Sequence, residues 1–70
     1  MSNLGTQRFR YVNTYGIHKE LSVSKSETMD GHYDFAIWNL ENGDYCSSGT
    51  ATKKQINEFL AGYGIKERLN

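Results

Sequence analysis

The chain is short of several residue types, and each shortage excludes a class of protein. Its single cysteine, Cys46, cannot form an internal disulfide. Small secreted domains usually support a thin core with two or more disulfides, so one cysteine favours a reducing compartment. The first residues hold no apolar h-region, and no run approaches the ~18 apolar residues of a membrane span. The sequence therefore predicts a cytoplasmic protein that does not enter a membrane.

The chain also lacks net charge and proline. Eight Lys and Arg residues balance eight Asp and Glu residues across 70 residues. This balance argues against a general polyanion binder, which is expected to be strongly basic. Without proline, the reversals of the chain depend on Gly, Asn and Asp. Five Tyr, three Phe and one Trp supply apolar bulk. We expect one small globular domain over residues 1–70, frayed at residues 1–6 and 66–70.

Alternating apolar and polar residues predict four strands. This period of two is typical of a half-buried strand, and β-branched and aromatic residues are enriched in it. The fourth segment is rich in serine and is expected to be a short edge strand. The predicted strands are residues 7–15, 17–25, 32–40 and 44–49.

A helix is predicted at the end of the chain. Thr52 and Gln55 have the spacing of a capping box, in which each side chain bonds to the other's exposed backbone N–H. Gly64 suits the left-handed position after a helix, followed by the apolar Ile65, and Gly62 is a competing stop two residues earlier. One apolar stripe runs along this helix at helical spacing: Ile56, Phe59, Leu60 and Tyr63. The predicted fold is α+β, a four-stranded antiparallel meander with one C-terminal amphipathic helix packed on one face (ββββα).

The dipeptide Asn42-Gly43 predicts a two-residue type I′ hairpin turn. The turn would pair Leu40 with Tyr45 and Trp38 with Ser47. One face of the hairpin then carries Trp38, Leu40 and Tyr45, and the other carries Phe35, Ile37 and Cys46. One helix covers one face, so the first face is either shielded by Leu4 and Leu69 or docks a partner protein or a second copy.

The chemistry of catalysis is sparse in this sequence. Cys46 is expected to be a small buried hydrophobe without an activating base. His18, His32 and Cys46 lack the spacing of a metal site. We therefore expect no enzyme activity, no metal and no cofactor.

Two functions remain open. The first is a non-enzymatic protein-binding module that acts through Trp38, Leu40 and Tyr45 with the acidic loop residues Asp44 and Asp30. The alternative is a small nucleic-acid-binding domain, because Arg8 and Arg10 alternate with aromatic residues and Lys53 and Lys54 open the helix. A weaker third possibility is a small subunit or regulator of a multi-chain enzyme.

The size and element order resemble those of small phage-encoded inhibitors of bacterial defence proteins. They are also similar to the strand-rich dimerising domain of HicB-type antitoxins. This resemblance implies an inhibitor or regulator of a larger protein, of phage or mobile-element type, and a possible homodimer. It rests on the build of the chain and carries over no residue.

Overall fold

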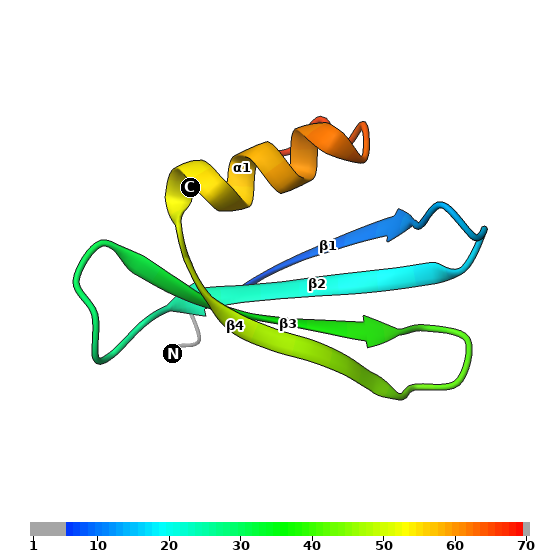
Figure 1. The fold of residues 1–70 in the computed structure, drawn as a ribbon, viewed down its shortest axis with the longest axis horizontal. Helices are drawn as coiled ribbons and strands as arrows, with labels where there is room; N and C mark the ends of the chain where they lie inside the picture. The colour runs from blue at the N-terminus through cyan, green and yellow to red at the C-terminus, as the bar shows by residue number, and fades with distance from the viewer. Residues whose placement is uncertain (1–5, 70) are drawn as a thin grey trace.

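The computed structural model describes residues 6–69 and confirms the predicted ββββα order. The four strands form one antiparallel sheet in the order β1-β2-β3-β4, and the helix follows the last strand (Figure 1). The elements are β1 (Gln7–Val12), β2 (His18–Lys25), β3 (His32–Asn39), β4 (Tyr45–Thr52) and α1 (Lys53–Gly62).

The helix α1 lies on one side of the sheet, above β1 and β2 (Figure 1). Its two buried residues, Ile56 and Leu60, pack with buried residues of these strands and of the C-terminal segment: Phe9, Leu21, Val23, Ile65 and Leu69. The β3 residues on the same side, Phe35 and Ile37, are only half-buried. The predicted helix-facing side is therefore confirmed, and the core is concentrated under β1 and β2.

Both ends of α1 have the predicted caps. The Thr52 hydroxyl accepts the Gln55 backbone N–H at 3.2 Å, and the Gln55 side chain accepts the Thr52 backbone N–H at 2.9 Å. At the other end, Gly64 has a φ of +73°. Ile65 N–H bonds to the Leu60 carbonyl and Gly64 N–H to the Ala61 carbonyl, each at 3.0 Å. These two bonds form a Schellman motif, which ends the helix after Gly62.

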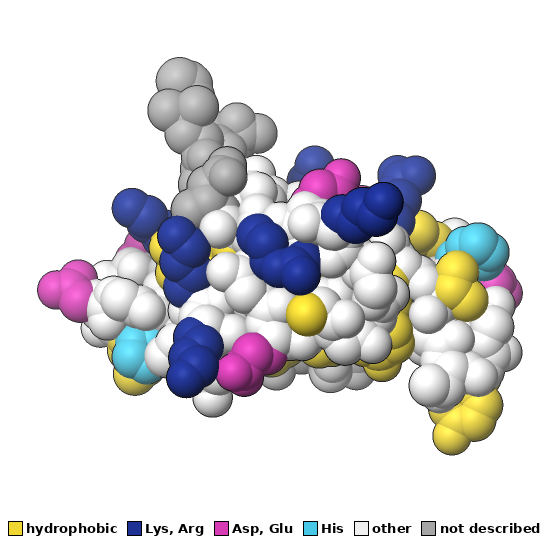
Figure 2. All heavy atoms as spheres, turned by 90° about the horizontal axis from the view of Figure 1, so that it is seen from above, with side chains coloured by type: hydrophobic (Ala, Val, Ile, Leu, Met, Phe, Trp, Pro, Cys, Tyr) yellow, Lys and Arg dark blue, Asp and Glu magenta, His cyan; other side chains and the backbone are white. Residues whose placement is uncertain are grey.

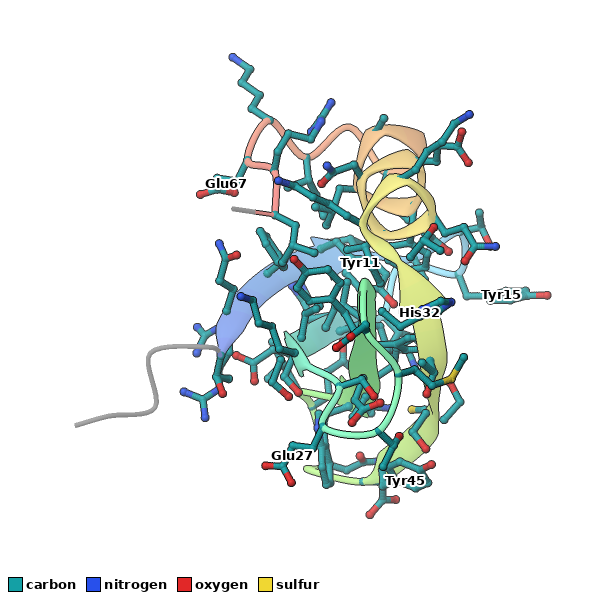
Figure 3. The ribbon with its side chains drawn as sticks, turned by 90° about the vertical axis from the view of Figure 1, so that its left-hand side faces the viewer. Tyr11, Tyr15, Glu27, His32, Tyr45 and Glu67 are labelled. Carbon is teal, nitrogen blue, oxygen red and sulfur yellow. The ribbon has the colours of Figure 1, made fainter. Side chains whose placement is uncertain are left out.

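The first strand ends three residues earlier than the alternation predicts, at Val12. The side-chain oxygen of Asn13 accepts the backbone N–H groups of Tyr15 and Ile17, both at 2.9 Å. An Asn side chain that bonds to the backbone two residues ahead favours a turn over a strand. Tyr15 consequently lies in the β1–β2 turn and projects into solvent (Figure 3).

The two-residue turn predicted at Asn42-Gly43 is wrong. Gly43 has a φ of +76°, but among the described residues only glycines have a positive φ, so Asn42 does not meet the type I′ requirement. Asn39 N–H bonds to the Asp44 carbonyl at 2.8 Å. The connection is thus four residues long, from Leu40 to Gly43.

A β-bulge follows this turn. Trp38 pairs with Tyr45 and Ile37 with Ser47, which leaves Cys46 as the extra residue of β4. The pairs predicted for Leu40 and Trp38 therefore do not form. β4 is eight residues long and not the short strand expected, and it is an edge of the sheet.

The C-terminal tail is packed rather than frayed over the part that the structure describes. Leu69 is 4% exposed within the core. Its backbone N–H bonds to the Asn57 side chain on α1 at 2.8 Å. Leu69 thus lies on the helix side and does not shield the other face of the sheet, whereas Leu4 lies outside the described residues.

Across residues 6–69, no helix has the length and apolar content needed to cross a membrane.

Candidate binding surface

The side of the sheet opposite α1, here called the open face, carries the residues that the sequence marks out for binding. The strand register sets one row of neighbours across all four strands, in the order Arg10, Glu20, Trp38 and Tyr45. Figure 3 places Tyr11 between the sheet and the helix and Tyr45 on the far side of the sheet. The predicted division of the two faces is therefore correct for Trp38 and Tyr45.

Trp38 and Tyr45 form an exposed aromatic pair on this face. Their ring centroids are 5.5 Å apart in an edge-to-face arrangement, with the planes at 68°. Trp38 is 38% exposed and Tyr45 is 54% exposed. The Tyr45 hydroxyl donates to the Ser48 hydroxyl at 2.6 Å, which holds the ring along β4. Leu40 is also exposed, in the turn beside them.

The two predicted acidic residues lie at opposite ends of the sheet. Asp44 directly precedes β4, next to Tyr45 and in the same connection as Glu41. Asp30 lies in the connection between β2 and β3, where its backbone carbonyl bonds to the His32 ring at 3.0 Å. Asp44 is therefore a sequence neighbour of Tyr45 at one end of the sheet, and Asp30 lies at the other end.

The four predicted basic residues are divided between the two sides of the sheet. Arg8 and Arg10 project from β1 on the open face, where the Arg10 Nε lies 3.6 Å from a Glu20 carboxylate oxygen. Lys53 and Lys54 belong to the first turn of α1, on the other side. Lys and Arg side chains are spread over that helix side in Figure 2. The four do not form one continuous patch.

Cys46 is exposed, contrary to the expectation of a buried hydrophobe. It is the extra residue of the bulge, and its Sγ lies 3.1 Å from the Lys19 Nζ. His18 begins β2 and His32 begins β3, so the antiparallel register puts them at opposite ends of the sheet. Within residues 6–69, no three His, Cys, Asp or Glu side chains are grouped to hold a metal ion.

A groove opens on the helix side, where α1 leaves β3 and β4 uncovered. Its volume is about 290 Å³. Beside the groove, Gly49 pairs with Phe35, and a Cβ at Gly49 would lie 3.0 Å from the Phe35 ring. The lining is mainly apolar, with the polar residues Thr50 and Gln55, and contains no titratable side chain: Leu21, Phe35, Ile37, Thr50, Ala51, Gln55, Ile56 and Phe59. It lacks the groups needed for acid–base chemistry.

Tyr11 is the titratable residue most affected by packing. Its ring lies 4.5 Å from the Tyr63 ring and 5.5 Å from the Phe59 ring, centroid to centroid. Burial raises the pKa of the Tyr11 phenol above its ordinary value, and the neighbouring Tyr63 and Cys46 raise it further. This supports a structural role under α1.

Sequence reasoning missed two residues of the open face. Val12 is exposed at the end of β1, and Glu20 is the neighbour of both Arg10 and Trp38. Both positions follow from the alternation of their strands, which assigns Val12 to the side of Arg8 and Arg10. The alternation of side chains along the strands was therefore the signal that could have identified both residues.

Comparisons with protein-family models, with curated proteins and with solved structures find no match to this chain.

Proposed function

We propose that this protein is a non-enzymatic protein-binding module and that its open face binds the partner. The observation that carries the proposal is the exposed pair of Trp38 and Tyr45 on the side of the sheet opposite α1. Trp and Tyr are the residues most enriched at the energetic centres of protein interfaces.

The surroundings of the pair support this assignment. Leu40 extends the apolar surface into the β3–β4 connection, where Glu41 and Asp44 supply an acidic border. An apolar patch with a polar rim is the usual layout of a protein interface. The acidic border favours a partner with a basic rim, because charge complementarity steers association. An inhibitor or regulator of a larger protein would use such a surface.

Co-purification from the native host, with nuclease present, tests the proposal. We expect one protein partner with the wild-type chain and loss of that partner with the double variant Trp38→Ala/Tyr45→Ala. The matched control is Lys53→Ala/Lys54→Ala, which alters the opposite side and should keep the partner. Recovery of the partner by both variants would contradict the proposal.

A single-stranded nucleic acid is the second candidate ligand. Arg8 and Arg10 share the open face with Trp38 and Tyr45, and aromatic rings beside basic groups can stack bases and contact phosphates. Two observations weaken the case for a nucleic-acid ligand. Arg10 is engaged with Glu20, and Lys53 and Lys54 lie on the other side.

The variant Arg8→Ala/Arg10→Ala distinguishes the two candidates. A nucleic-acid function predicts that this variant and nuclease treatment each abolish recovery, with a strong dependence on salt. A protein-binding function predicts that the partner survives nuclease.

A further inference from the structure

The edge strand β4 has unpaired hydrogen-bonding groups. The Asn39 backbone N–H donates to the Asp44 carbonyl, and the Leu40 backbone N–H donates to the His18 carbonyl. Because backbone hydrogen bonds alternate between the two sides of a strand, odd-numbered residues of β3 bond to β4 and even-numbered residues bond to β2. Ser48 and Thr50 face the even-numbered residues Ala36 and Asp34. Their backbone N–H and carbonyl groups therefore point away from the sheet, where no described residue bonds to them.

β4 also has little of the protection that natural edge strands carry. Lysine, proline and short length are the usual devices that prevent edge-to-edge pairing. Residues 45–52 contain no charged residue and no proline, and their single irregularity is the bulge at Cys46. Residues 45–50 are exposed.

The two ends of β4 are oppositely charged. Glu41 and Asp44 precede the strand, and Lys53 and Lys54 follow it. The ion pair found within residues 6–69 joins Arg10 to Glu20, so Asp44 and Lys54 have no ion-pair partner in the described chain. The first turn of α1 contains no acidic residue, and lysines at a helix N-terminus are unfavourable to the helix dipole.

We propose that a second copy of this chain pairs with β4, antiparallel, about a two-fold axis at Gly49. In this register Ser48 of each copy faces Thr50 of the other, and the backbone groups that point away from each sheet bond to one another. The acidic end of each β4, at Asp44, then meets the basic end of the other, at Lys53 and Lys54. The interface is therefore self-complementary in both hydrogen bonding and charge, as a two-fold interface requires.

The pairing also accounts for the lysines at the start of α1. Each copy supplies Asp44 to the helix N-terminus of the other, where a negative charge is favourable. The two sheets become one sheet of twice the width, with both helices on one side and both open faces on the other. This inference does not depend on the proposed function, because it rests on the outward backbone groups of β4, whereas the proposed function rests on the exposed rings of Trp38 and Tyr45.

Sedimentation equilibrium of the full chain tests the pairing, over protein concentrations from low micromolar to near-millimolar. We expect a reversible dimer. Ser48→Pro removes an outward N–H without removing a bond to β3 and should leave a monomer. The matched control Ser48→Ala loses the same hydroxyl but keeps the N–H, and it should still dimerise. Circular dichroism checks that the proline variant is folded.

A charge exchange gives a second test that does not depend on the proline variant. Asp44→Lys and Lys54→Glu should each weaken the dimer about tenfold, because each replaces two attractions by two repulsions. Mixing the two variants should restore dimerisation. In the mixed dimer the lysine introduced at position 44 of one copy faces the glutamate introduced at position 54 of the other, and the native pair forms on the other side.

Three results would overturn the proposal. They are a monomer at all concentrations, a dimer that Ser48→Pro leaves intact, and a failure of the mixed charge variants to recover. A dimer lost in Trp38→Ala/Tyr45→Ala but kept in Ser48→Pro would assign self-association to the open face instead. The protein-binding proposal is judged separately, by partner recovery with the same Trp38 and Tyr45 variant.

Discussion

Tyr11 is the residue at which the sheet and the helix meet. Its ring contacts both Phe59 and Tyr63 of the C-terminal part, and its hydroxyl lies in partly buried surroundings. The phenol is neutral at neutral pH, and burial raises its pKa because the charged phenolate would be poorly solvated at this site. A single side chain thus links helix packing to alkaline stability.

Loss of stability at high pH should depend on Tyr11. Its pKa is raised above the ordinary 10.0, mainly by burial, so the folded protein holds the phenol proton more tightly than the unfolded chain does. This contribution is complete below pH 10 and is lost as the pH rises through the folded pKa. Tyr11→Phe should therefore lose less stability than wild type in urea unfolding above pH 10.

Tyr15→Phe is the control, because Tyr15 is exposed in the β1–β2 turn. An equal loss of unfolding free energy above pH 10 in wild type and in Tyr11→Phe would show that Tyr11 does not report helix packing.

The capping box gives a second prediction for a single residue. Thr52→Ala removes the hydroxyl that accepts the Gln55 N–H, and we expect a loss of about 1 kcal/mol of unfolding free energy. Thr14→Ala, in the exposed β1–β2 turn, should change it little. Urea unfolding at neutral pH measures both. Equal losses of unfolding free energy in Thr52→Ala and Thr14→Ala would contradict a stabilising role for the Thr52 cap.

At the scale of elements, the sequence predicted the structure correctly wherever a single local residue pattern determines it. The period of two in β2 and β3 depends only on which face is buried, and the α1 caps depend on local backbone bonds. The β3–β4 turn was not predictable in this way. Its predicted pairing differs from the observed one by two positions at Asp44, which keeps Asp44 and Tyr45 on their predicted faces, whereas Ser47 pairs with Ile37 and changes face. The bulge at Cys46 then adds one residue, which no local signal announced.

The tail illustrates a different limit. Residues 66–69 have no periodic pattern of their own, and their placement depends on a long-range contact between Leu69 and α1. Tertiary packing of one apolar side chain cannot be inferred from local sequence. The same holds for the position of α1 above β1 and β2, which leaves the groove over β3 and β4.

Leu69→Ala tests the docked tail. A fully buried leucine that is truncated to alanine costs about 2–5 kcal/mol, because transfer energy is lost and a cavity remains. We expect a loss in this range from urea unfolding, since Leu69 is 4% exposed. Lys66→Ala, at an exposed position of the same tail, should have little effect. A Leu69→Ala variant as stable as wild type would mean that the tail is not docked.

At the scale of the whole molecule, the sheet has one side covered by the helix and tail and one open face. Alternation along β3 predicted that Trp38 would lie opposite Phe35 and Ile37, and the register confirms this. The division of the basic residues follows from the same alternation, because Arg8 and Arg10 lie on the other side of β1 from the buried Phe9, whereas Lys53 and Lys54 belong to α1. The fold therefore exposes the adjacent rings of Trp38 and Tyr45 on the side away from the helix.

Trp38 offers the most direct test, because it is the only tryptophan in the chain. The measurement is ¹⁹F NMR of the protein labelled with 5-fluorotryptophan, alone and in the complex recovered from the host. We predict a single resonance that shifts in the complex and loses its H₂O/D₂O isotope shift, because a partner protein covers the ring. An unchanged resonance and isotope shift would contradict the account.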